Sequence, residues 1–179
     1  MSNLLKKLGW KWILMIVVDA GLLAVLAVLW WLSEVTPFRA GDMLFPVQRA
    51  AEDGRIALQG DPLKRAQMSF SQVERRLADL SMSRDIEHVN ASVLALDDAL
   101  SNAIKMISQV PSEDMEGLYD QAKLVLMRAE LVVEGVKERL DSQELTDLQD
   151  KIIALEQASS IAEFQTLASK PVKTSQEIA

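Results

Sequence analysis

The chain has 179 residues, a net charge of −7 and no cysteine. This length allows one domain with a modest core, and the acidic charge argues against nucleic acid as a partner. The absence of cysteine excludes disulfides and thiolate metal sites. Helix-forming residues dominate and strand-type alternation of apolar and polar residues is absent, so the predicted fold class is all-α.

The most apolar part of the chain is residues 12–32, which carry one charged side chain, Asp19. As a helix this run would extend ~31 Å, about the thickness of the hydrocarbon core of a bilayer. It is therefore predicted to be a transmembrane helix that serves as a signal anchor. The alternative is a cleaved signal peptide, but its apolar region would be shorter and would end in small residues rather than in Trp30-Trp31-Leu32.

The flanks of this run predict its orientation. Three lysines precede it, and Glu34 opens the far side. Because positive charge is retained in the cytoplasm, residues 1–11 are expected to be cytoplasmic and the rest extracytoplasmic. The prediction is a single-pass protein of the cytoplasmic (inner) membrane, with the lipid bilayer as one partner.

Asp19 is the unusual residue of the predicted span. An acidic group at such a depth usually faces protein or water rather than lipid. Small residues on or near the same side would let another helix approach closely; they are Ala20, Gly21, Ala24 and Ala27. Two interpretations stay open: Asp19 contacts a membrane helix of a second copy or of a partner, or it is protonated and tolerated.

A linker is predicted at residues 33–41, followed by one helical domain over residues 42–169. Its first helix is short, begins between residues 42 and 46, and ends near residue 59. Asp61 is a good N-cap and Pro62 suits the first helical position, so the next helix begins there. Its apolar stripe changes phase at residues 81–83, which means either a tight turn or a skip within one long helix.

The remaining helices are separated by clear stop signals. Pro111 ends one helix and Ser112 is expected to cap the next, over residues 112–140. Asp141 and Glu144 have the spacing of a capping box for a last helix over residues 142–169. Residues 170–179 are expected to form a flexible tail. The short connections predict antiparallel neighbours, as an up-down bundle or as a long helical hairpin.

Three segments carry a recognisable pattern: GDMLFPVQRAAE at residues 41–52, GDP at residues 60–62, and RAQMSFSQVERRLADL at residues 65–80. This pattern resembles a family of bacterial membrane-anchored extracytoplasmic helical domains of unknown function. Gln48 stands where the family usually has Lys. The resemblance implies a helical domain that follows one membrane span, sometimes in anti-sigma-factor-like chains. The 11 residues before the span are too few for a sigma-binding domain, so that role is not expected.

The pattern residues are predicted to dock the short helix onto the domain, with a ligand site as the alternative. Asp42 could cap that helix, and Leu44, Phe45 and Val47 could hold it against its neighbour. A buried arginine, fixed by Glu74 or Asp79 of the next helix, would specify the docking. The full set comprises Gly41, Asp42, Leu44, Phe45, Pro46, Arg49, Glu52, Gly60, Asp61, Pro62, Arg75, Arg76 and Leu77.

Chemistry-bearing patterns are scarce. The only histidine, His88, follows Asp85 at a spacing that could supply half of a metal site, but no second histidine exists to complete it. A solvated or capping histidine is the expected role, and no enzymatic activity, metal or cofactor is predicted. Two functions stay open: a non-enzymatic membrane protein that presents an extracytoplasmic interaction module, and an accessory subunit of a larger membrane complex.

Overall fold

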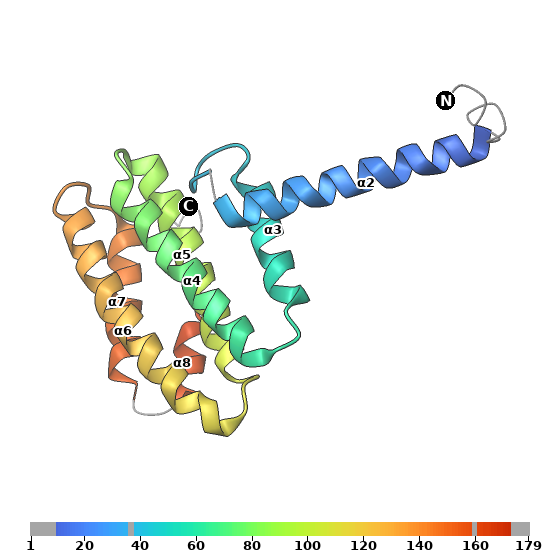
Figure 1. Cartoon of the computed structure of the whole chain (residues 1–179). Helices are drawn as coiled ribbons and strands as arrows, with labels where there is room; N and C mark the ends of the chain where they lie inside the picture. The colour runs from blue at the N-terminus through green and yellow to red at the C-terminus, as the bar shows by residue number, and fades with distance from the viewer. Residues whose placement is uncertain (1–9, 36–37, 159–160, 173–179) are drawn as a thin grey trace.

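The computed structural model describes residues 10–35, 38–158 and 161–172, and within these ranges every regular element is an α-helix (Figure 1). The all-α prediction is therefore confirmed. In chain order the helices are α2 (Trp10–Val35), α3 (Phe45–Leu58), α4 (Pro62–Met82), α5 (Ile86–Ile107), α6 (Ser112–Lys137), α7 (Gln143–Gln157) and α8 (Ile161–Ala168).

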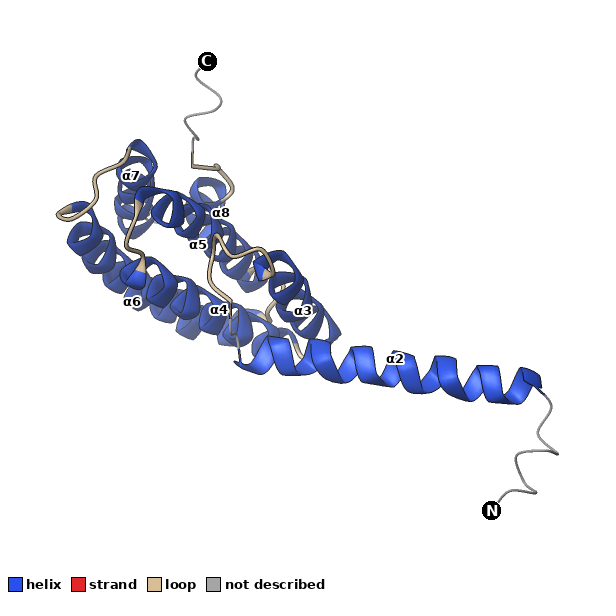
Figure 2. Cartoon of the chain, turned by 90° about the horizontal axis from the view of Figure 1, so that it is seen from above, coloured by secondary structure: helices blue, strands red, loops and turns tan. Residues whose placement is uncertain are grey.

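Helix α2 projects away from the other helices (Figures 1 and 2). It contains a stretch, Trp12–Trp31, that is long and apolar enough to cross a membrane. Its large apolar side chains are mostly exposed, in contrast to the apolar residues of the remaining helices, which are mostly buried. Its C-terminal end contacts α3.

The core is enclosed by α4, α5, α6 and α7. Helix α4 packs against α5 and α6, α7 packs against α6 and α5, and α8 closes one end against α5 and α7. The apolar stripes predicted from helical periodicity face this interior: Phe70, Leu96, Ala129 and Ile152 are among the buried side chains. Packing of amphipathic faces against one another is what stabilises these helices.

The phase change at residues 81–83 is a turn between two helices. Helix α4 ends at Met82, and α5 begins at Ile86 after Asp85, whose side chain accepts a hydrogen bond from the His88 amide at 3.0 Å. Asp61 caps α4 as predicted, accepting from the Leu63 amide at 3.0 Å. Both carboxylates pair with amides that have no partner within the helix.

Two other predicted caps were displaced by one residue. Pro111, rather than Ser112, occupies the N-cap position of α6, and this helix ends at Lys137 instead of residue 140. Ser142, rather than Asp141, caps α7 by accepting from the Leu145 amide at 3.2 Å. At α7, both Asp and Ser can act as caps, and the chain geometry places Ser142 at the helix end. At α6, Pro111 occupies the N-cap position without a side-chain cap.

The predicted single helix over residues 142–169 is two helices, α7 and α8. Lys123 of α6 explains the interruption, because its ammonium donates to the carbonyl oxygens of Leu155 and Glu156 at the end of α7 and of Ala158 just beyond it. The Tyr119 hydroxyl also donates to the Ala158 carbonyl, at 2.9 Å. These side chains satisfy carbonyls that a continuing helix would have used itself.

The start of the predicted tail is also held in place. Val172 is buried, and its amide donates to Asp97 of α5 at 3.0 Å. Asp97 forms an ion pair with Lys151 of α7, whose ammonium also donates to the Lys170 carbonyl. Residues 170–172 therefore belong to the folded domain, and residues 173–179 lie outside the described part of the chain.

The packing of α6 provides a direct test of the core. Val125 is buried, whereas its neighbour Leu124 is 62 % exposed. Val125→Asp would place an unpaired charge in the core and should lower the melting temperature of the full chain in detergent by about 10 °C or more, while Leu124→Asp should have little effect. Circular dichroism measures both. Equal effects of the two substitutions would contradict the packing of α6.

Candidate functional site

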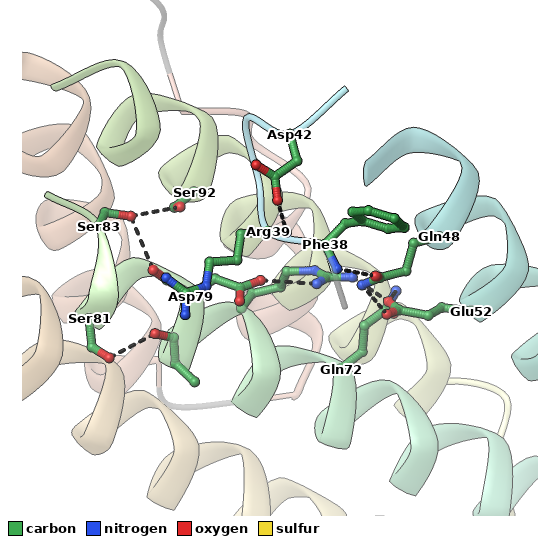
Figure 3. A network of polar contacts seen from close by, with 12 residues as sticks. Phe38, Arg39, Asp42, Gln48, Glu52, Gln72, Asp79, Ser81, Ser83 and Ser92 are labelled. Atoms are coloured by element: carbon green, nitrogen blue, oxygen red, sulfur yellow. Dashed lines mark hydrogen bonds and ion pairs between the residues drawn. The ribbon is translucent and has the colours of Figure 1, made fainter. Parts of the chain in front are cut away.

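The most elaborate polar cluster in the described residues lies between α3 and α4, where Glu52 of α3 is buried. Its carboxylate accepts hydrogen bonds from Gln48 Nε2 and Gln72 Nε2, each at 3.1 Å, and forms an ion pair with Arg76 of α4. We call Gln48, Glu52, Gln72 and Arg76 the docking cluster. Figure 3 shows its labelled members converging from the two helices. Because each oxygen of Glu52 has a donor, its charge is compensated within the protein.

Arg76 occupies the centre of this contact. Only 2 % of its surface is exposed. One amino group pairs with Glu52, and the other donates to Asp79 Oδ2 at 3.2 Å. The guanidinium carbon also lies 4.7 Å from the ring centroid of Phe45, a cation–π geometry. Loss of one partner would leave a buried charge uncompensated, so this site specifies how α3 packs on α4.

Asp79 lies at the margin of the cluster. Its partial burial raises the pKa of the Asp79 carboxyl above its usual value, and the positive charge of Arg76 opposes that rise. Burial disfavours the charged form of a carboxyl group, whereas a neighbouring cation favours it. Arg76 thus interacts with two carboxylates, one from each of the helices it joins.

The segment before α3 joins the same cluster. The Phe38 amide donates to Gln48 Oε1 at 2.8 Å, and the Arg39 amide donates to Asp42 Oδ2 at 2.7 Å (Figure 3). Gly41 has a φ of +99°, and a Cβ atom there would lie 3.0 Å from the His88 ring. Glycine avoids both the strained conformation and the close contact. The turn thereby brings the end of α2 toward α3.

Several pattern residues differ from their predicted roles. Leu44, rather than Asp42, occupies the N-cap position of α3, and Asp42 bonds backward to Arg39 because the chain turns before the helix begins. Phe45 is buried, as expected of a docking residue, but Leu44 and Val47 are exposed. The helix is oriented by its polar residues, so these two apolar side chains face outward.

The charged residues of the pattern contribute in different ways. Arg49 pairs with Asp98 of α5 at 2.9 Å in an exposed contact, whereas Glu74 pairs with Arg128 of α6. Glu74 therefore does not fix an arginine of α3. The buried arginine comes from α4, as Arg76, and its partner on α3 is Glu52. The prediction placed the arginine on the short helix and its acidic partner on the next helix. In the structure the arginine lies on α4 and the acidic partner on α3.

The remaining predicted residues are spread along the chain. Pro46 lies in the first turn of α3, and the connection from α3 to α4 contains Gly60, Asp61 and Pro62. On α4, Arg75 is half-buried and Leu77 is part of the core. On α2, Asp19 and the residues of the predicted small face, Ala20, Gly21, Ala24 and Ala27, are exposed. The structure therefore brings together Phe45, Glu52 and Arg76, but not the whole set.

Two members of the docking cluster, Gln48 and Gln72, were not predicted. A signal for them exists in the sequence, because Gln72 lies at a position beside the buried face of α4, and Gln48 and Glu52 are four residues apart on one face of α3. The sequence gives no direct indication that this polar face is the buried one.

His88 is hydrogen-bonded to Asp85, three residues before it. Its Nδ1 lies 2.8 Å from Asp85 Oδ1 at the exposed start of α5. This hydrogen bond and the negative charge of Asp85 raise the pKa of His88, and bonding to the His88 amide and side chain lowers the pKa of Asp85. Among the described residues, no group of three or more His, Cys, Asp or Glu side chains is arranged to hold a metal ion. Asp85 caps α5, and the His88 side chain is hydrogen-bonded to the carboxylate of that cap.

The chemistry available in the docking cluster is electrostatic. It contains neither a hydroxyl nor a thiol nucleophile, and the Glu52 carboxylate is saturated by donors. Comparison of the chain with protein-family models, with curated proteins and with solved structures finds no match. The assignment of a role to this cluster therefore depends on its geometry.

The docking cluster predicts a large effect of removing Arg76. Arg76→Met would leave Glu52 buried without its ion-pair partner and should lower the stability of the α3–α4 contact by about 3–5 kcal/mol. Amide hydrogen exchange of α3 in the full chain measures this loss. The matched control is Arg128→Met, which removes an exposed ion pair and should change protection by about 1 kcal/mol or less. Unchanged protection of α3 in Arg76→Met would contradict the assigned role.

Proposed function

We propose that this chain is a non-enzymatic single-pass membrane protein of the bacterial cytoplasmic membrane that presents an extracytoplasmic helical interaction module. The observation that carries the proposal is α2: an apolar helix of sufficient length whose side chains find no burial in the domain. In water, such a surface would be strongly unfavourable; in a bilayer, it matches its surroundings. The three lysines before the helix favour a cytoplasmic N-terminus.

The non-enzymatic part of the proposal is supported by how the polar side chains are used. Those of the docking cluster, the Asp97–Lys151 pair and Lys123 hold helices and chain segments together. The side chain of His88, the single histidine, is hydrogen-bonded to Asp85, the N-cap of α5. Side chains engaged in packing contacts are poor candidates for acid, base or nucleophile.

A patch on α6 supports an interaction with another protein. Leu124, Met127 and Leu131 are exposed and lie on one side of this helix. In Figure 1, α6 lies on the other side of α4 from α3, and α2 extends from the α3 side of the domain. Grouped apolar residues on a water-facing surface are typical of protein contacts, so the proposed partner is another membrane or extracytoplasmic protein.

The topology is testable because the chain has no cysteine. A cysteine introduced as Leu131→Cys should react with a membrane-impermeant maleimide in intact spheroplasts, since α6 would lie outside the cytoplasm. A cysteine introduced as Asn3→Cys should react only after permeabilisation. The reverse pattern of labelling would overturn the orientation, and labelling of neither variant in intact spheroplasts would place the domain in the cytoplasm.

A second candidate function, an accessory subunit packed through its span, is favoured by Asp19. This carboxylic side chain is exposed in the middle part of α2, next to Ala20 and Gly21. An acidic group at that depth costs ~2.5–3.5 kcal/mol on insertion scales, which a hydrogen bond to another helix would offset.

Asp19→Leu separates the two functions, because it removes the polar group at similar size. An accessory subunit should lose its partners, or a second copy of itself, and run at lower mass after extraction in mild detergent. A lone anchor should run at the same mass before and after the substitution. The matched control is Val18→Leu at the adjacent exposed position, which leaves the carboxylic group in place.

A further inference from the structure

Helix α3 buries polar side chains and exposes apolar ones, the opposite of an ordinary surface helix. Its buried positions are Phe45, Gln48, Glu52 and Ile56, so half of the buried face is polar. At 100° per residue, the opposite face is wholly apolar and consists of Val47, Ala50, Ala51, Gly54, Ala57 and Leu58. A helix of a water-soluble domain normally turns its apolar face inward.

This outward apolar face is accessible. Leu58 is 88 % exposed and Val47 is 45 % exposed. A contiguous exposed apolar surface indicates a contact that the isolated chain does not show. The docking cluster holds the helix in this orientation, because rotation would expose Arg76 to an apolar helix face and separate Glu52 from its donors on α4, Gln72 and Arg76.

The face lies beside the end of the membrane helix. A groove of about 470 Å³ separates α2 from α3, lined by Leu26, Leu29 and Trp30 on one side and by Ala50, Gly54 and Leu58 among the residues on the other. The Arg55 guanidinium lies 5.0 Å from the centroid of the Trp30 ring, so the two helices are joined at this point. In Figure 1, α3 runs across the direction of α2 at its C-terminal end.

The residues that line the groove between α2 and α3 indicate what fills it. Leu26 and Leu29 belong to the apolar stretch that ends at Trp31, so one wall of the groove is the span itself. A helix that crosses the end of a span lies in the plane of the membrane surface. Tryptophan and arginine side chains are suited to the headgroup level, where Trp30 and Arg55 meet. A soluble protein partner would not reach a groove walled by the span.

We infer that α3 lies on the outer surface of the bilayer, with the face formed by Val47, Ala50, Ala51, Gly54, Ala57 and Leu58 turned toward lipid and acyl chains filling the groove against α2. This inference rests on the proposed membrane span. Its partner is the lipid surface, bound through apolar contact rather than through net charge. The span and α3 together fix the domain close to the membrane and leave the exposed patch of α6 directed into the aqueous phase.

The test uses the full chain reconstituted in phosphatidylcholine vesicles, with one introduced cysteine carrying an environment-sensitive fluorophore. Labels at Leu58→Cys and Val47→Cys should emit at shorter wavelength and lose most of their emission to lipids with a nitroxide near the headgroup. The matched control, Leu131→Cys on α6, is also exposed and should be quenched by aqueous iodide instead. Both α3 positions are exposed, so neither substitution disturbs the core.

A label at Gly21→Cys, within the span, distinguishes the failure of this inference from the failure of the span. If Gly21→Cys is quenched by lipid nitroxide while Leu58→Cys and Val47→Cys respond to iodide like the α6 control, the span stands and the inference is overturned. Labels on α3 that respond to neither quencher would show that protein covers the face, which also overturns it. If Gly21→Cys itself responds to iodide, both the span and the docking of α3 fail.

Discussion

The buried ion pair between Arg76 and Glu52 determines the arrangement of the N-terminal half of the protein. Two charges removed from water are tolerated only when their remaining hydrogen-bonding groups are satisfied. Here Gln48, Gln72 and Asp79 provide those partners. Because this requirement directs the polar residues of α3 inward, the apolar residues of the helix must face outward. The outward orientation of the apolar face of α3 is thus a consequence of the ion pair between Arg76 and Glu52.

The same contact connects α2 to the rest of the helical domain. Phe38 donates its amide to Gln48, and Arg55 contacts Trp30 at the end of α2, so α3 is held on both sides. The domain itself is held by apolar packing of α4 to α7, with Lys123 and the Asp97–Lys151 pair fixing its C-terminal segments. The protein therefore combines a conventional apolar core with a buried polar contact between α3 and α4, beside the end of α2.

The sequence predicted those elements whose cause is local. Asp61 and Pro62 begin α4 because capping depends on neighbouring amides, and the apolar stripes of α4 to α7 follow from helical periodicity. It did not predict the interruption between α7 and α8, because Lys123 acts from another helix. Nor did it predict which face of α3 is buried. The polar face of α3 is buried because Glu52 pairs with Arg76, a residue that is distant along the chain.

A double-mutant cycle between Arg76 and Glu52 tests this account most directly. The free energy of opening of α3, obtained from amide exchange, would be measured for the wild type, Arg76→Met, Glu52→Leu and the double variant. If the two residues form one buried pair, the double variant should be more stable than the sum of the single effects allows, with a coupling of about 1–3 kcal/mol. Effects that add to within about 0.5 kcal/mol would contradict the central role of the pair.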